Sequence, residues 1–190
     1  MHRVPTASAT TGPFFPPRYV DEGCNDLTRF EGRAARGAPI EIHGRVVQED
    51  GKPLHNLIVE IWQADAAGIF RHPADPRAAQ ADPGFLGWGR TATDRDGGYR
   101  FRSVLPGGYA QPEGTRRARH VNMQLMFSGL MRVLCTTLYF EGEPDNEADP
   151  VLAAVPAARR ALLVATRDAP ASYRLDIRLR GEGETPFFDL

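Results

Sequence analysis

Cysteine, net charge and long apolar runs are scarce in this sequence of 190 residues, and each shortage excludes a class of protein. The two cysteines, Cys24 and Cys135, lie far apart without CxxC spacing, which excludes a disulfide framework and predicts buried or idle thiols. A formal net charge of −1 gives no reason to expect binding to nucleic acid or to an anionic membrane. No stretch approaches the roughly 20 apolar residues of a membrane span, and the first residues contain no signal-peptide core, so we expect a cytoplasmic protein.

Motifs that mark other enzyme classes are also missing. The sequence contains no G-x-S-x-G elbow, P-loop or G-x-G-x-x-G fingerprint. His43, His55 and His72 share no spacing and no acidic neighbour that would indicate zinc. Nothing indicates burial that would shift a carboxyl pKa, so a solvated loop is predicted for the cluster Glu141, Glu143, Asp145, Glu147 and Asp149.

Proline and glycine, in contrast, are abundant, with 16 and 19 residues, and they indicate many turns. In residues 1–38, Pro13, Pro16 and Pro17 exclude a regular helix or a central strand. The same segment contains aromatic residues, which are scarce in disordered tails. Their presence favours an extended arm that docks against another surface. We therefore predict an N-terminal arm over residues 1–38 and one folded domain over residues 39–190.

Short runs of alternating apolar and polar residues fill the predicted domain over residues 39–190. They predict strands over residues 40–46, 57–62, 88–93, 99–105, 119–127, 131–140, 161–166 and 173–179. Two hairpins are expected, one around the turn at residues 94–98 and one around Ser128-Gly129. The predicted fold is an all-β, antiparallel β-sandwich.

Two further segments depart from the strand pattern. Residues 149–160 favour short helical turns, because they are rich in alanine and Pro156 prevents a longer helix. Residues 64–87 are too long for a plain hairpin loop, and loops of that length usually carry function or pack against a partner.

Several sequence blocks resemble one enzyme family. They are EIWQADAAGIF (60–70), TDRDGGYRF (93–101), LPGGY (105–109), TTGPF (10–14), LYFE (138–141) and the tail from residue 176 to residue 189. The chain resembles the intradiol ring-cleavage dioxygenases from about residue 10 to its last residue. The resemblance implies a β-sandwich, ferric iron, and O₂-dependent cleavage of a catechol in the catabolism of aromatic compounds.

The resemblance also assigns four ligand positions. Intradiol enzymes hold Fe(III) with two tyrosines and two histidines, because hard phenolate oxygens stabilise the ferric state. The matching positions here are Phe70, Tyr109, His120 and Asn122, so one phenolate and one imidazole are lost. The spacing from Tyr109 to His120 is also shorter than in active chains. We therefore expect no iron on this chain and no catalytic residue in it, with Tyr109 at a strand end and His120 a hydrogen-bonded core histidine.

A role beside an iron-binding partner follows from the resemblance. It implies an alpha-type chain that pairs with a homologous beta-type chain, which holds the Fe(III), in a larger hetero-oligomer acting on 3,4-dihydroxybenzoate. The arm residues Thr10, Gly12, Pro13 and Phe14 match positions that reach the substrate in the partner's pocket, although a proline-rich arm can also pack on its own domain.

Two arginines and one serine complete the site predictions. Ser128 stands where the family pattern expects a substrate-side arginine, and Arg132 is a candidate to replace it. Arg117 matches an arginine that active chains carry just before the His-x-His motif, and without iron we expect it to form an ion pair or anchor a loop. Two alternatives stay open, a self-sufficient intradiol dioxygenase with an atypical iron site and a non-catalytic β-sandwich binding module.

Overall fold

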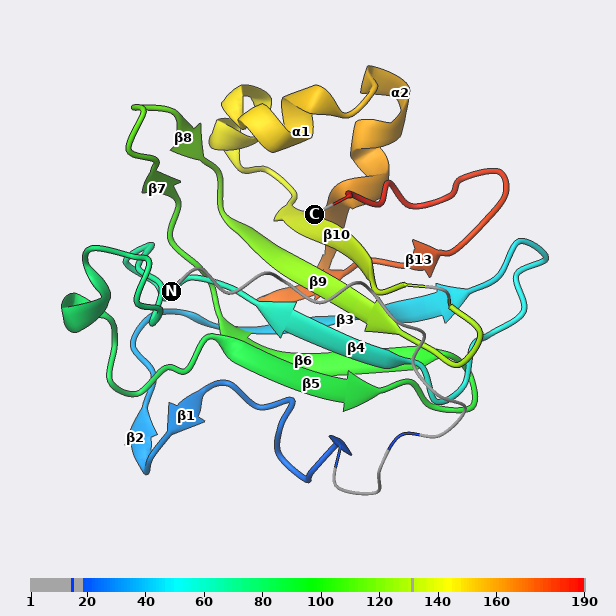
Figure 1. Cartoon of the computed structure of the whole chain (residues 1–190), viewed down its shortest axis with the longest axis horizontal. Helices are drawn as coiled ribbons and strands as arrows, with labels where there is room; N and C mark the ends of the chain where they lie inside the picture. The colour runs from blue at the N-terminus through cyan, green and yellow to red at the C-terminus, as the bar shows by residue number, and fades with distance from the viewer. Residues whose placement is uncertain (1–14, 16–18, 131, 190) are drawn as a thin grey trace, which may run out of the picture.

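The computed structural model describes residue 15, residues 19–130 and residues 132–189, and it places their strands in two packed layers (Figure 1). One layer contains β6 (Gly98–Val104), β3 (Pro39–Val47), β12 (Ser172–Arg174) and β13 (Ile177–Arg178). The other contains β5 (Trp88–Ala92), β4 (Ile58–Trp62), β9 (His120–Met126) and β10 (Leu134–Phe140). Strand β11 (Val164–Ala169) pairs with both β10 and β12, so the hydrogen bonding runs continuously from one layer to the other.

The core forms because successive side chains of a strand point to opposite faces. In β3, Ile42 and Val46 are fully buried, whereas Arg45 is exposed. In β9, Val121 and Leu125 are fully buried, whereas Gln124 is exposed. The four buried residues belong to one continuous apolar cluster that joins the two layers. The prediction of an all-β sandwich is confirmed, with three short parallel pairings among otherwise antiparallel strands.

One of the two predicted hairpins is wrong. Strand β5 pairs with β4, and β6 pairs with β3, so the turn after β5 carries the chain from one layer to the other. Asp94 stabilises this turn by accepting the backbone N–H groups of Asp96 and Gly98. The turn residues therefore predict a reversal correctly but not the partner of each strand. The other hairpin, β9 with β10, is confirmed.

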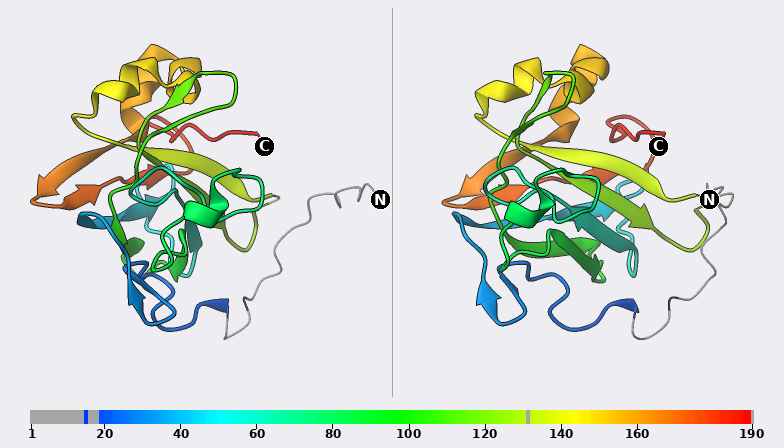
Figure 2. Two further views of the ribbon diagram at one scale, coloured as in Figure 1. Left: turned by 90° about the vertical axis from the view of Figure 1, so that its left-hand side faces the viewer. Right: turned by 60° about the vertical axis from the view of Figure 1, so that its left-hand side comes forward.

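Short helices cover one end of the sandwich, at the top of Figure 1 and in both views of Figure 2. They are η3 (Pro144–Ala148), α1 (Pro150–Ala154), α2 (Ala157–Arg160) and η4 (Ala161–Leu163). The prediction of short helical turns over residues 149–160 is confirmed, and Pro156 separates the two α-helices. No helix in the described ranges is long and apolar enough to cross a membrane.

The described part of the N-terminal segment packs against the sandwich. Leu27 is buried in the main core, and Leu27 and Asn25 exchange backbone hydrogen bonds with Arg102 of β6. Next come the short strands β1 (Arg29–Phe30) and β2 (Arg33–Ala34), which pair with each other. The boundary between residues 38 and 39 stays a prediction.

Candidate functional site

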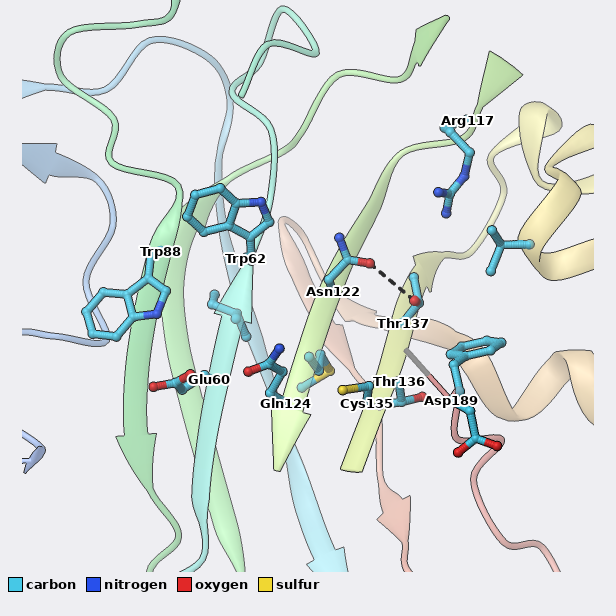
Figure 3. Close-up of a pocket in the computed structure, with 14 residues that line it drawn as sticks. Glu60, Trp62, Trp88, Arg117, Asn122, Gln124, Cys135, Thr136, Thr137 and Asp189 are labelled. Carbon is cyan, nitrogen blue, oxygen red and sulfur yellow. Dashed lines mark hydrogen bonds between the residues drawn. The ribbon is translucent and has the colours of Figure 1, made fainter. Parts of the chain in front are cut away.

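The outer face of the layer formed by β5, β4, β9 and β10 carries a polar and aromatic surface. Adjacent residues across these strands form two rows, Trp88–Trp62–Asn122–Thr137 and Arg90–Glu60–Gln124–Cys135. A hollow of about 610 Å³ lies over this face, and Val151 of α1 and Phe188 of the tail also line it. Figure 3 shows the side chains of this hollow, which we call the sheet-face hollow.

A chain of aromatic contacts lies beside the sheet-face hollow. The ring of Phe70 stacks on Trp62, with centroids 6.1 Å apart, and meets Tyr109 edge-on at 5.3 Å. The Tyr109 ring lies 5.8 Å from His120, and His120 lies 6.0 Å from Tyr139. Asn122 follows His120 on the same face of β9 and faces Trp62 on β4. The fold therefore brings together all four positions that the family pattern assigns to the metal.

The short spacing between Tyr109 and His120 does not separate their rings. Strands β7 (Tyr109–Ala110) and β8 (Arg116–Arg117) pair as a small hairpin, with Tyr109 opposite Arg117. This hairpin returns the chain to the start of β9. The prediction that Tyr109 lies at a strand end is confirmed.

His120 is a buried histidine with one unused ring nitrogen. Its Nδ1 lies 2.7 Å from the carbonyl oxygen of Ala118, so Nδ1 carries the proton and donates it. Its Nε2 is buried and has no hydrogen-bond partner in the described part of the chain. Burial, reinforced by the charge of Arg117, lowers the pKa of His120 from 6.5 to about 4. The imidazole is therefore neutral at pH 7, and the prediction of a hydrogen-bonded core histidine is confirmed.

The donors at the four positions do not fit the ferric site of the family. Tyr109 offers a phenol and His120 offers Nε2, but Phe70 has no side-chain donor, and the Oδ1 of Asn122 accepts a hydrogen bond from Thr137 at 3.3 Å. Burial raises the pKa of Tyr109, so without a metal its phenol keeps the proton. Within the described ranges, no three His, Cys, Asp or Glu side chains gather as a metal cluster. Two donors are too few for tight binding of ferric iron.

The carboxylates after β10 are not all solvated, so that prediction is wrong for Asp149. Asp149 is fully buried and accepts hydrogen bonds from Arg117 at 2.9 Å and from Tyr139 at 2.8 Å. It also caps α1 by accepting the N–H groups of Val151 and Leu152. Burial alone raises its pKa, but the hydrogen bonds outweigh burial and hold the pKa below the usual range. An aspartate followed by proline at a helix start is a capping signal that sequence reasoning missed.

Arg117 forms the ion pair predicted for it. The residue is 9% exposed, and its guanidinium group lies between Asp149 and Tyr139 at one end of the sheet-face hollow. Burial acts to lower the pKa of Arg117, but the contacts with Asp149 outweigh burial and raise it. The pair therefore stays charged and fixes the β8 strand against α1.

The carboxylates of Asp65 and Asp75 hold the long loop of residues 64–87 in shape. Asp65 accepts N–H groups from within the loop, including those of Ile69 and Asp82. Asp75 accepts the N–H of Phe70 at 3.0 Å and pairs with Arg77. Sequence analysis predicts that this loop is functional or packs against a partner but gives these carboxylates no role, because no pattern shows which turn each one closes.

The structure describes only some of the residues that are predicted to lie near the substrate. Thr10, Gly12, Pro13 and Phe14 are outside the described residues, so their roles stay predictions. Ser128 is half-buried in the turn after β9. Arg132 is exposed and pairs with Asp189 at 2.6 Å. Among the described histidines outside the four metal positions, His72 is exposed and meets the ring of Trp62 edge-on at 6.0 Å. His43 lies elsewhere and pairs with Asp168 at 2.9 Å.

The lowered pKa of His120 predicts a loss of stability in mild acid. The unfolded chain takes up a proton at His120 near pH 6.5, and the folded chain does so only near pH 4. The contribution of neutral His120 to the free energy of unfolding is therefore complete above pH 6.5 and falls as the pH drops towards 4. The expected loss is on the order of 3 kcal/mol. Urea titrations between pH 7 and pH 4 measure it. His120→Gln is expected to flatten the profile and the exposed His55→Gln to leave it unchanged; identical profiles would exclude His120 as the cause.

The comparisons with known proteins agree with this geometry. The family model described as "Dioxygenase" matches residues 10–181. The chain is 38% identical to the protocatechuate 3,4-dioxygenase alpha chain of Burkholderia cepacia, covering 97% of both chains. It is 40% identical to the beta chain from the same organism, over 85% of this chain and 74% of that one.

A solved structure extends the match to the fold. The dioxygenase domain of a dioxygenase carbohydrate-binding protein fusion from Streptomyces sp. SirexAA-E is 28% identical, with a TM-score of 0.62 over 94% of this chain and 99% of that one. The match with the family model and both relatives covers most of the chain. The chain therefore belongs to the intradiol ring-cleavage dioxygenase family.

Proposed function

We propose that this chain is the alpha-type subunit of a heteromeric protocatechuate 3,4-dioxygenase, in which a homologous beta-type subunit binds Fe(III). The observation that carries the proposal is the pair Phe70 and Asn122, which remove two of four donors from positions that still lie together. The sequence identities, 38% to the alpha chain and 40% to the beta chain, are too similar to distinguish the two types. Coverage of 97% of the alpha chain, against 74% of the beta chain, supports the alpha type.

In this proposal the reaction is cleavage of 3,4-dihydroxybenzoate between its two hydroxylated carbons. Both atoms of O₂ enter the product, 3-carboxymuconate, and the ring opens on the beta-type chain. This chain contributes its arm: Pro13 restricts the backbone, Gly12 lets it approach closely, the hydroxyl of Thr10 can bind the substrate carboxylate, and Phe14 excludes water.

Purification of the full chain with and without a beta-type homologue tests the proposal. The lone chain is expected to be colourless and free of iron, whereas the complex is expected to bind iron, absorb visible light and cleave the ring. Tyr109→Phe in this chain should leave the iron content of the complex unchanged, because Tyr109 is no ligand there. Iron and ring cleavage on the lone chain would establish a self-sufficient enzyme, and failure to form any complex would favour a binding module.

Arg132 is the candidate that replaces the arginine expected at Ser128. Its side chain is 63% exposed and its partner Asp189 is 81% exposed, so the guanidinium group is accessible to a substrate carboxylate. Arg132→Ala in the heteromer is expected to raise KM about 10-fold or more, the value of a charge-assisted hydrogen bond. Steady-state kinetics beside Arg180→Ala, another exposed paired arginine, checks this prediction. An unchanged KM removes Arg132 from the site.

A further inference from the structure

A second hollow, of about 720 Å³, lies between the long loop and the β7 strand. Its apolar and aromatic walls include Trp62, Phe70, Tyr109, Pro76 and Pro112. Polar side chains also line it, namely His72, Asp75, Arg77 and Gln111. Both segments lie on the left side of Figure 1. Small-molecule sites in proteins commonly measure about 300–1,000 Å³ and have mainly apolar and aromatic walls. We call this the loop hollow; its volume leaves ample room for a small ligand, and its aromatic walls offer flat faces to a planar ring.

The loop hollow is held open by the chain itself. Gly68 has a positive φ of 75°, and an added Cβ there would come within 2.4 Å of the carbonyl oxygen of Gly108. The N–H of Gly107 donates to Asp65 O at 2.9 Å, so the loop is fastened to the segment that carries Tyr109. The backbone N–H of Phe70 donates to Asp75, which fixes the backbone that carries the ring of Phe70. A ligand would find these walls already ordered, which lowers the entropy cost of binding.

Polar groups lie at one side of the same hollow. Arg77 uses Nε and Nη2 to bind Asp75 and the carbonyl oxygen of Gly68, and no hydrogen bond from its Nη1 occurs within the described ranges. Gln111 accepts a hydrogen bond from Thr115 through Oε1, which leaves its amide N–H groups as donors. Both side chains line the hollow. Two donors beside an aromatic wall match a carboxylate attached to a ring.

We propose that the loop hollow binds a small aromatic acid without any metal. The ring lies against Trp62 and Phe70, and the carboxylate accepts hydrogen bonds from Arg77 and Gln111. Phenylalanine at position 70 suits this use, because it gives an apolar wall where a tyrosine would present a hydroxyl group. The site goes beyond the proposed subunit role and does not depend on it, since every residue belongs to this chain.

Calorimetric titration of the full chain with benzoate tests the proposal. Binding is expected with a dissociation constant of roughly 1 mM, as suits a ligand of so few atoms. Benzamide, which lacks the charge, and cyclohexanecarboxylate, which lacks the flat ring, are each expected to bind at least about 5-fold more weakly. Equal binding of either probe overturns the assignment of an aromatic acid, and no binding of benzoate overturns the site.

Two matched variants locate the binding. Ala74 is exposed and lines the loop hollow, whereas Ala79 is exposed on the same loop but lies outside its lining. Ala74→Trp is expected to fill the hollow and weaken benzoate binding more than 10-fold, while Ala79→Trp changes it less than 2-fold. Thermal unfolding of both variants verifies the fold. Equal effects of the two substitutions overturn the location. In the heteromer, Ala74→Trp is expected to leave benzoate binding at any site on the partner unchanged.

Discussion

A chain carrying both Phe70→Tyr and Asn122→His is expected to bind ferric iron stoichiometrically, whereas the unchanged chain is not. The two substitutions add the missing phenol and imidazole at positions where Phe70 already meets Tyr109 at 5.3 Å and His120 precedes Asn122 on one face of β9. The Nε2 of His120 is already unprotonated, and no described residue forms a hydrogen bond with it. The sheet-face hollow of about 610 Å³ gives the imidazole at position 122 room. Metal analysis and the visible charge-transfer band of an iron tyrosinate are the measurements.

A control with the same added groups separates geometry from composition. Phe188 and Gln124 line the same sheet-face hollow. Within the described residues the ring of Phe188 has no contact with the rings of Tyr109 or His120. Gln124 lies opposite Glu60 and Cys135, in the row of side chains next to that of Asn122. Phe188→Tyr with Gln124→His is therefore expected to bind no iron tightly, because metal sites require donors in the right geometry as well as the right number. Iron bound equally by both double variants, or by neither, would contradict the view that the four positions keep the shape of a metal site.

The strand pattern predicts much of this fold, because alternation with a period of two is a local property. In β4, Val59 and Ile61 face the core while Glu60 and Trp62 face outward, as the alternation in the sequence indicates. The pairing of strands is not local. The turn at residues 94–98 looks like a hairpin, yet β5 and β6 belong to different layers, since each finds a better partner elsewhere in the chain.

The candidate site, too, has features that the sequence shows and features that depend on contacts between distant residues. The identities of Phe70 and Asn122 can be read from the sequence, and the resemblance gives them meaning. The sequence does not reveal that Asp149 is buried, because four neighbouring carboxylates are partly or fully exposed and only the fold brings Arg117 and Tyr139 to this one. The loop hollow likewise depends on contacts between residues about 40 positions apart, such as Gly68 with Gly108.

The second large effect is expected from Asp149→Ala, which should reduce the free energy of unfolding by about 3–5 kcal/mol. The substitution leaves the guanidinium group of Arg117 buried without its counter-charge and removes the acceptor of Tyr139. It also exposes unsatisfied N–H groups at the start of α1, where Asp149 is the N-cap. Asp149→Asn keeps a capping oxygen but removes the charge, so an intermediate loss is expected. Urea unfolding measures each value.

Asp145→Ala is the matched control, because Asp145 pairs with Arg116, the residue before Arg117. The side chains of this outer pair are exposed, at 41% for Asp145 and 58% for Arg116. Exposed pairs of this kind contribute about 0–1 kcal/mol. Equal losses for Asp145→Ala and Asp149→Ala would show that burial does not strengthen the inner pair. If the large difference is found, Asp149 is the residue that holds α1 and β8 together at the end of the sheet-face hollow, where Val151 and Arg117 form its wall. The shape of that hollow then depends on the buried pair of Arg117 and Asp149.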